Sequence, residues 1–71
     1  MPPKRYIVQI QDSYLAEFLY HWTQHGKPCP LLFQRPHSDG LTAIRLEVRD
    51  DDTALFLADA LAATGCKLYE K

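Results

Sequence analysis

Apolar residues recur with a helical period between Ser13 and His25. Ser13 or Asp12 is expected to cap the first amide groups of this helix, and Gly26 with Pro28 to end it. The apolar stripe contains two aromatic rings, which need a broad apolar surface such as a sheet to pack against. Its members are spaced i, i+3, i+4 and i+7 and share one helix face: Leu15, Phe18, Leu19 and Trp22.

Four other segments have a pattern typical of β-strands. Arg5–Ile10 (RYIVQI) has apolar residues on both faces, which predicts a central strand. Leu31–Arg35 (LLFQR) lies between two prolines, which suits an edge strand because proline cannot donate to a ladder. In Leu41–Arg49 (LTAIRLEVR) apolar and polar residues alternate, so one face of this strand is expected to be exposed to solvent. Cys66–Tyr69 is predicted to close the chain as a short strand.

A second helix is predicted from Thr53 to Thr64. The aspartates before it, Asp50–Asp52, are expected to cap its first turn, where the helix dipole favours carboxylates, and Gly65 suits its end. Before the third strand, the loop Pro36–Gly40 reverses the chain through an Asp-Gly turn. The expected inward stripe of the second helix is Ala54, Leu57, Ala58 and Leu61.

The elements follow the order strand, helix, strand, strand, helix, strand within one domain, residues 1–71. Right-handed crossovers place both helices on the same side of the sheet. We therefore predict an α+β, ferredoxin-like βαββαβ fold, a four-stranded antiparallel sheet with two helices on one face. The inward residues of the third strand are then Thr42, Ile44, Leu46 and Val48.

The composition is that of a small globular domain. Apolar residues make up 46% of the 71 positions, and so short a chain often gains stability by dimerisation, so a homodimer is expected. The two cysteines, Cys29 and Cys66, are too few for a disulfide scaffold. Residues 1–12 (MPPKRYIVQIQD) do not have the pattern of a signal peptide, and no segment is long and apolar enough to span a membrane. We therefore expect a cytoplasmic protein without a signal peptide.

Charge is balanced overall but uneven along the chain. Eight Lys and Arg against nine Asp and Glu give a net charge of −1, which disfavours a nucleic-acid binder. The third strand also lacks the aromatic residues that stack on bases in RNA-recognition modules of this element order. Glu47, Asp50, Asp51 and Asp52 form an acidic cluster. This cluster and the outward sheet face remain as surfaces for binding another protein. The predicted partner-binding residues are Arg45, Glu47, Arg49, Asp50, Asp51, Asp52 and Tyr69.

Other groupings have both a functional and a structural interpretation. His21, His25 and Cys29 are spaced at four and four, as zinc ligands can be, but no fourth ligand is evident and a wet helix end explains the histidines more simply. The acidic cluster could bind a divalent cation or mimic a phosphate backbone, although a run such as Asp50–Asp52 before a helix most often caps it. No nucleophile motif surrounds Ser13 or Ser38, and no glycine-rich phosphate loop is present. We therefore expect no catalytic activity, no metal and no cofactor.

Two stretches, RYIVQIQDSYLAEFLYHWTQHG and GLTAIRLEVRDDDTALFLADALAATGCKLYE, resemble the ACT family of small regulatory domains. This resemblance implies the βαββαβ order, dimerisation through sheets or helices, and amino-acid binding at the first strand–helix turn. At that turn the chain has Gln11-Asp12-Ser13, where the family usually has a glycine that admits the ligand.

In size and in its acidic patch, the chain also resembles small one-domain inhibitors made by phages, anti-CRISPR proteins among them. The expected function is a stand-alone, non-catalytic module that inhibits or regulates a partner protein. The alternative is an ACT-like sensor of amino acids.

Overall fold

Two long antiparallel strands form the centre of the sheet in a computed structural model of the chain, which describes residues 3–35 and 38–70. β1 and β3 pair along their whole length, from Lys4 opposite Val48 to Gln11 opposite Leu41. The elements in chain order are β1 (Lys4–Gln11), the 3₁₀ turn η1 (Asp12–Tyr14), α1 (Leu15–Gln24), β2 (Leu32–Gln34), β3 (Leu41–Val48), α2 (Asp51–Thr64) and β4 (Lys67–Glu70).

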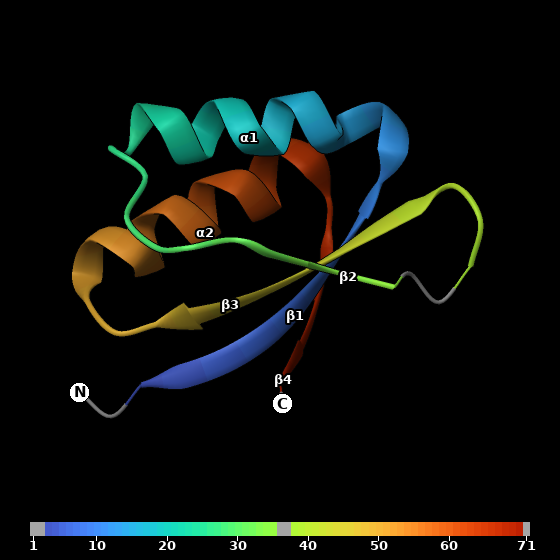
Figure 1. Ribbon diagram of the computed structural model, residues 1–71. Coiled ribbons are helices and arrows are strands. Elements are labelled where there is room, and N and C mark those ends of the chain that lie inside the picture. Colours follow the sequence, from blue (N-terminus) through green and yellow to red (C-terminus); the bar gives the residue numbers. More distant parts are fainter. Residues whose placement is uncertain (1–2, 36–37, 71) are drawn as a thin grey trace.

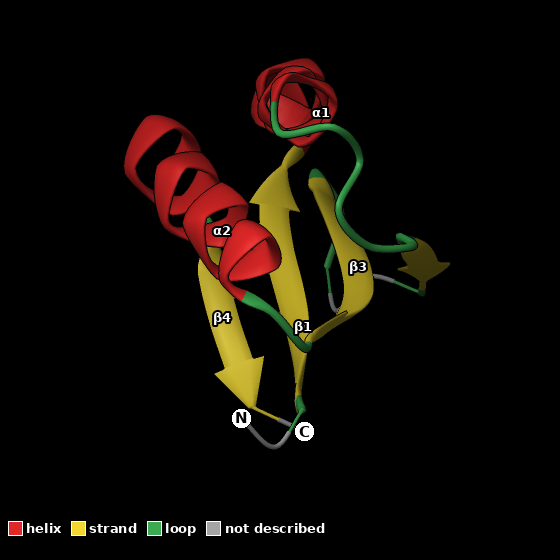
Figure 2. Ribbon diagram, turned by 90° about the vertical axis from the view of Figure 1, so that its left-hand side faces the viewer, coloured by secondary structure: helices red, strands yellow, loops and turns green. Residues whose placement is uncertain are grey.

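The four strands lie in the order β2-β3-β1-β4, and every neighbouring pair is antiparallel. Both helices cover one face of this sheet, as Figures 1 and 2 show. The chain therefore has the α+β, ferredoxin-like fold that the sequence predicts. β1 is central and β2 is an edge strand, also as predicted. The other sheet face carries no helix (Figure 2).

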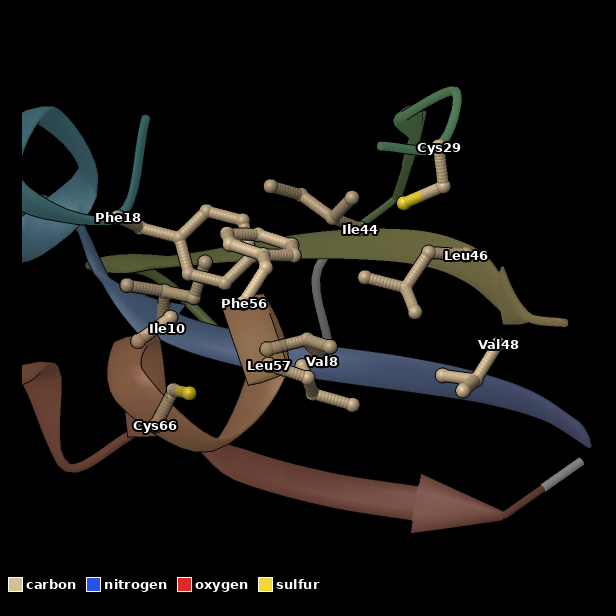
Figure 3. Close-up of a cluster of buried hydrophobic side chains, with 11 residues drawn as sticks. Val8, Ile10, Phe18, Cys29, Ile44, Leu46, Val48, Phe56, Leu57 and Cys66 are labelled. Atoms are coloured by element: carbon tan, nitrogen blue, oxygen red, sulfur yellow. The ribbon is translucent and has the colours of Figure 1, made fainter. Parts of the chain in front are cut away.

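The core lies between this sheet and the helices, and two phenylalanines occupy its centre. Phe18 from α1 and Phe56 from α2 are both fully buried, and their rings meet edge to face with centroids 5.3 Å apart. Figure 3 shows the two rings among the buried side chains of the sheet. The predicted inward face of β3 is confirmed for Ile44, Leu46 and Val48, which are all buried. Thr42, on the same face, is half-buried.

The start of the first helix differs from the prediction. The chain makes a 3₁₀ turn before α1 begins at Leu15, and neither Asp12 nor Ser13 caps the helix. The reason is that the Asp12 carboxylate accepts a hydrogen bond from Thr42 Oγ1 at 2.6 Å. The predicted apolar stripe does face the core, with Phe18 buried and Leu15, Leu19 and Trp22 packed at its margin.

The predicted inward stripe of α2 is confirmed only in part. Leu57 is buried and Ala54 packs against the core, as predicted. Ala58 and Leu61 are exposed, whereas Phe56 and Ala60 are fully buried. The helix is turned so that its largest side chain, Phe56, reaches the centre of the core. It begins at Asp51, earlier than predicted, and ends at Gly65, whose φ of +63° is the left-handed conformation that favours glycine.

Strand lengths and one buried residue add further corrections. β2 has three residues rather than five, and β3 ends at Val48. Ala43 points to the open face but is only 1% exposed, because it is short and lies between Gln9 of β1 and Gln34 of β2. The start of the predicted loop, residues 36–37, lies outside the described residues.

Candidate functional site

The open face of the sheet has a row of side chains that crosses all four strands. Leu32 lies opposite Arg45, Arg45 opposite Ile7, and Ile7 opposite Tyr69. Leu32 is 54% exposed and Tyr69 is 48% exposed, while Ile7 is half-buried between them. The row therefore presents an accessible apolar strip interrupted by one guanidinium group.

Positive charge surrounds this row. The register places Arg5, Arg45 and Lys67 on the open face, and Arg49 bonds to Glu47 on the same side. Arg49 Nε donates to Glu47 Oε1 at 3.0 Å and Arg49 Nη2 donates to Glu47 Oε2 at 3.3 Å. These bonds, with the charges of the nearby arginines, lower the pKa of Glu47. The same bonds, with the charge of Glu47, raise the pKa of Arg49. Among the described residues, four cationic side chains and one carboxylate, that of Glu47, therefore lie on this face.

A cleft of about 480 Å³ opens at the edge of this face, beside β3. Its floor is the second half of β3 with the neighbouring part of β1, and its wall is the segment Pro28–Pro30 that precedes β2. The volume is in the range of ligand-binding pockets. The cleft is lined by Arg5, Pro28, Cys29, Pro30, Leu32, Arg45, Leu46, Glu47, Arg49, Asp50 and Thr53.

Specific contacts hold the wall of the cleft in place. Trp22 Nε1 donates a hydrogen bond to the carbonyl oxygen of Cys29 at 2.8 Å, which ties the wall to α1. The turn between them includes Lys27, whose φ is +54° and whose ammonium lies 5.7 Å from the centroid of the Trp22 ring. On the other side, the Thr53 hydroxyl lies 3.5 Å from the Pro28 carbonyl oxygen. Both helices therefore position the cleft.

The acidic cluster at the start of α2 divides into two parts. Asp50 Oδ1 accepts from the backbone N–H of Thr53 at 2.8 Å and from its hydroxyl at 2.7 Å, so Asp50 is the N-cap. These two bonds lower the pKa of Asp50. Asp51 and Asp52 lie in the exposed first turn and have no such internal partner among the described residues. The structural interpretation therefore holds for Asp50, and the other two carboxylates face solvent.

Cys29 is the thiol nearest to this cleft. It is 7% exposed, and Figure 3 shows its side chain pointing from the wall toward β3. Burial, with the nearby charge of Asp50, raises the pKa of the Cys29 thiol above its ordinary value. The thiolate, which is the nucleophilic form, is therefore scarce at neutral pH. Cys29 and Cys66 are both free and buried.

The structure does not bring His21, His25 and Cys29 together as a metal site. His25 Nε2 lies 2.8 Å from Asp59 Oδ2, an ion pair that joins α1 to α2 when the imidazole is protonated. The His21 ring packs edge to face against Tyr20. Within the described residues, no group of three or more His, Cys, Asp and Glu side chains is arranged to hold a metal ion.

The ACT resemblance implies an amino-acid site at the first strand–helix turn. In the structure, hydrogen bonds to Gly40 and Thr42 hold this turn. The backbone N–H of Asp12 donates to the carbonyl oxygen of Gly40 at 2.9 Å, and the Asp12 carboxylate accepts from Thr42. The backbone N–H and the carboxylate of Asp12 are thus both engaged with the start of β3 and the residue before it.

The structure brings part of the predicted partner-binding set together. Arg45, Glu47, Arg49 and Asp50 line one cleft, Tyr69 lies in the same cross-strand row as Arg45, and Asp51 and Asp52 lie just beyond the cleft in the first turn of α2. Sequence reasoning missed the contribution of the wall and of Arg5 to the cleft. The outward register of Arg5 and the proline pair in GKPCP were the available signals.

Comparison of the chain with known proteins found no matching family model, no matching curated protein and no matching solved structure. No helix in the described part of the chain is long and apolar enough to cross a membrane.

Proposed function

We propose that this chain is a non-catalytic module that binds another protein and thereby inhibits or regulates it. The observation that carries this proposal is the cleft beside β3, which continues into the exposed Leu32–Tyr69 row of the open face. Accessible apolar residues framed by charged ones are typical of protein-binding surfaces. An inhibitor or regulator without chemistry of its own acts by occupying such a surface of its partner.

The reactive groups around the cleft support a binding role over a catalytic one. The Asp50 carboxylate is engaged by Thr53, and the Glu47 carboxylate by Arg49. The lowered pKa of each carboxyl keeps it charged at neutral pH, which makes it a poor proton donor. The raised pKa of Cys29 disfavours it as a nucleophile. Asp51 and Asp52, next to the cleft, are proposed to extend the binding surface.

Photo-crosslinking in the producing cells tests this proposal, with benzoylphenylalanine placed at either of two exposed residues. Leu32 lies at the cleft and is 54% exposed, whereas Tyr20 on α1 is 58% exposed and lies outside the cleft. A discrete adduct with another protein is expected from Leu32 only, and it should disappear when Arg45→Glu is added. Adducts from Tyr20 alone, or from neither position, would refute the proposal.

A homodimer is proposed through β2, the edge strand of the sheet. Leu32 and Phe33 are both more than half exposed and point to opposite faces of this strand, which makes it prone to pair with another chain. Sedimentation velocity should show a dimer that Phe33→Ser dissociates, and a monomeric wild type would contradict this. The two free cysteines agree with a reducing compartment, and a cytoplasmic location is proposed.

The alternative function, an amino-acid sensor of the ACT type, is favoured by the ferredoxin-like fold and by the volume of the cleft. A thermal-shift panel of the twenty amino acids separates the two functions, because a ligand that binds only the folded state raises its melting temperature. The binding-module proposal predicts no dose-dependent shift. A saturable shift with one amino acid would favour the sensor.

A further inference from the structure

Two arginines on the floor of the cleft have no carboxylate within ion-pair distance among the described residues. Arg5 is opposite Glu47 in the strand pair, and Arg45 is two residues from Glu47 on the same face. Both oxygens of Glu47 already accept hydrogen bonds from Arg49. Because guanidinium groups bind carboxylates through paired hydrogen bonds, Arg5 and Arg45 are available to an acidic ligand.

The edge of β3 is open beside these arginines. β2 pairs with β3 only opposite residues 43–45, so residues 46–48 have no strand neighbour on that side in the described structure. No backbone hydrogen bond joins residues 28–31 to β3 there. Alternate residues of a strand direct their N–H and C=O groups to opposite edges of the strand. An extended segment that lies beside residues 46–48 can therefore pair with the free edge of β3 by strand addition.

The Pro28–Pro30 wall of the cleft is apolar and has few backbone groups that need a hydrogen-bond partner. Pro28 and Pro30 have no backbone N–H. The Cys29 carbonyl is occupied by Trp22 Nε1, and the Pro28 carbonyl lies near the Thr53 hydroxyl. A segment in the cleft would thus pair with β3 on one side and pack apolar side chains against proline and Leu32 on the other.

From these three observations we propose that the cleft binds an extended acidic segment of a partner protein, laid along the free edge of β3. Carboxylates of the segment form ion pairs with Arg5 and Arg45. The side chain between two such carboxylates packs against the Pro28–Pro30 wall. This inference rests on the proposed binding function and specifies the chemistry of the partner.

Charge and shape favour this occupant over two others. Nucleic acid needs aromatic platforms for its bases, and on the cross-strand row only Tyr69 is aromatic, with aliphatic Leu32 and Ile7 beside it. A second copy of this chain would offer Asp51 and Asp52, but these lie in a helix rather than in an extended segment.

Selection of a displayed library of random 12-residue peptides on the intact chain tests this inference. Enriched peptides are expected to carry two acidic residues two positions apart with one apolar residue between them. In calorimetry of a synthesised winner, Arg5→Gln and Arg45→Gln should each weaken binding by about tenfold or more, because each removes a charge-assisted pair. Lys67→Gln is the matched control, since it removes the same charge from the open face outside the cleft and should leave binding unchanged.

Backbone pairing has its own readout in peptides with N-methylated amides. Because a strand pairs through alternate residues, methylation at alternate positions should abolish binding and methylation between them should be tolerated. Equal tolerance at every position would overturn strand addition.

Other results would overturn the acidic-segment proposal with different consequences for the proposed function. Non-acidic peptides whose binding is lost on Leu32→Asp would leave the cleft as the binding site and remove only the acidic specificity. Enriched peptides that bind Leu32→Asp, Arg5→Gln and Arg45→Gln as well as wild type would overturn both proposals. A fluorescent oligonucleotide that bound more tightly than any selected peptide would make the open face a nucleic-acid interface instead.

Discussion

Trp22 Nε1 donates a hydrogen bond to the carbonyl oxygen of Cys29 across seven residues, at 2.8 Å. This bond closes the turn after α1 and fixes the proline segment that forms the wall of the cleft. The same indole packs at the margin of the core. One residue therefore couples the stability of the helix–sheet packing to the shape of the binding surface.

Replacement of Trp22 by Phe should loosen that wall while the fold survives. The substitution keeps an aromatic ring but leaves the Cys29 carbonyl without its donor, which costs about 1 kcal/mol of unfolding free energy. Urea denaturation followed by circular dichroism measures this loss. Tyr20→Phe, on the exposed side of α1, is the control and should change stability by less than about 0.5 kcal/mol. Equal effects of the two substitutions would contradict the coupling.

Phe18→Ala should be among the most damaging single substitutions. The ring is fully buried and packs edge to face on Phe56, so its removal leaves a cavity that costs about 3–5 kcal/mol. For a chain this small, that is a large share of a total stability of about 5–15 kcal/mol. Leu55→Ala on the exposed face of α2 is the control. A chemical-denaturation midpoint unchanged by Phe18→Ala would show that the helices do not pack through these rings.

Acid should destabilise the fold partly through Asp50. Its pKa is lower in the folded state, so its carboxylate contributes stability above the ordinary aspartate pKa, and this contribution is lost as the pH falls through the folded value. Asp50→Asn keeps a capping side chain without a titrating group. The variant should therefore lose less stability than wild type between about pH 5 and pH 2. Identical pH profiles would contradict this role.

Glu47 should add acid sensitivity of the same sign. Arg49 lowers its pKa in the folded state, so protonation of Glu47 also removes stability as the pH falls. Glu47→Gln should flatten the remaining pH dependence of the Asp50→Asn variant in the same urea titrations. If the double variant were as acid-sensitive as Asp50→Asn alone, the remaining pH dependence of stability would come from other carboxyl groups, which would contradict this role of Glu47.

Cys29 should react slowly with alkylating agents despite its place at the cleft. Burial and the charge of Asp50 raise the pKa of its thiol. In a Cys66→Ser background, iodoacetamide labelling at pH 8 should be slower in the folded chain than in urea, and Asp50→Asn should accelerate it. Labelling at the unfolded rate in native buffer would indicate that the wall opens freely.

The sequence was sufficient to predict the fold because its apolar patterns agree with one topology. The alternation in Leu41–Arg49 and the stripe from Leu15 to Trp22 each specify an element and the face that it buries. The stripe of α2 was predicted correctly at Ala54 and Leu57 but not at Ala58 and Leu61. All four residues have helical spacing, yet the adjacent Phe56 is larger and takes the core position. Alanines supply a pattern but little packing energy.

The site was harder to predict because it depends on contacts between distant residues. Arg45 and Glu47 could be assigned to the open face from alternation alone. The cleft, in contrast, exists because β2 is short and because Trp22 holds the proline segment beside β3. Neither the length of an edge strand nor a side-chain bond to a loop carbonyl has a clear signature in one sequence. The predicted Asp12 cap failed for the same reason, since its partner Thr42 is 30 residues away.

The central claim is that the cleft beside β3 is the surface through which this chain binds a partner. Amide hydrogen exchange of the chain, alone and bound to the protein crosslinked at Leu32, tests it most directly. Added protection is expected in residues 28–32 and 45–49, which line the cleft, with no change in the exposed face of α1 around Tyr20. Protection confined to α1, or to β4 at the opposite edge of the sheet, would contradict the account.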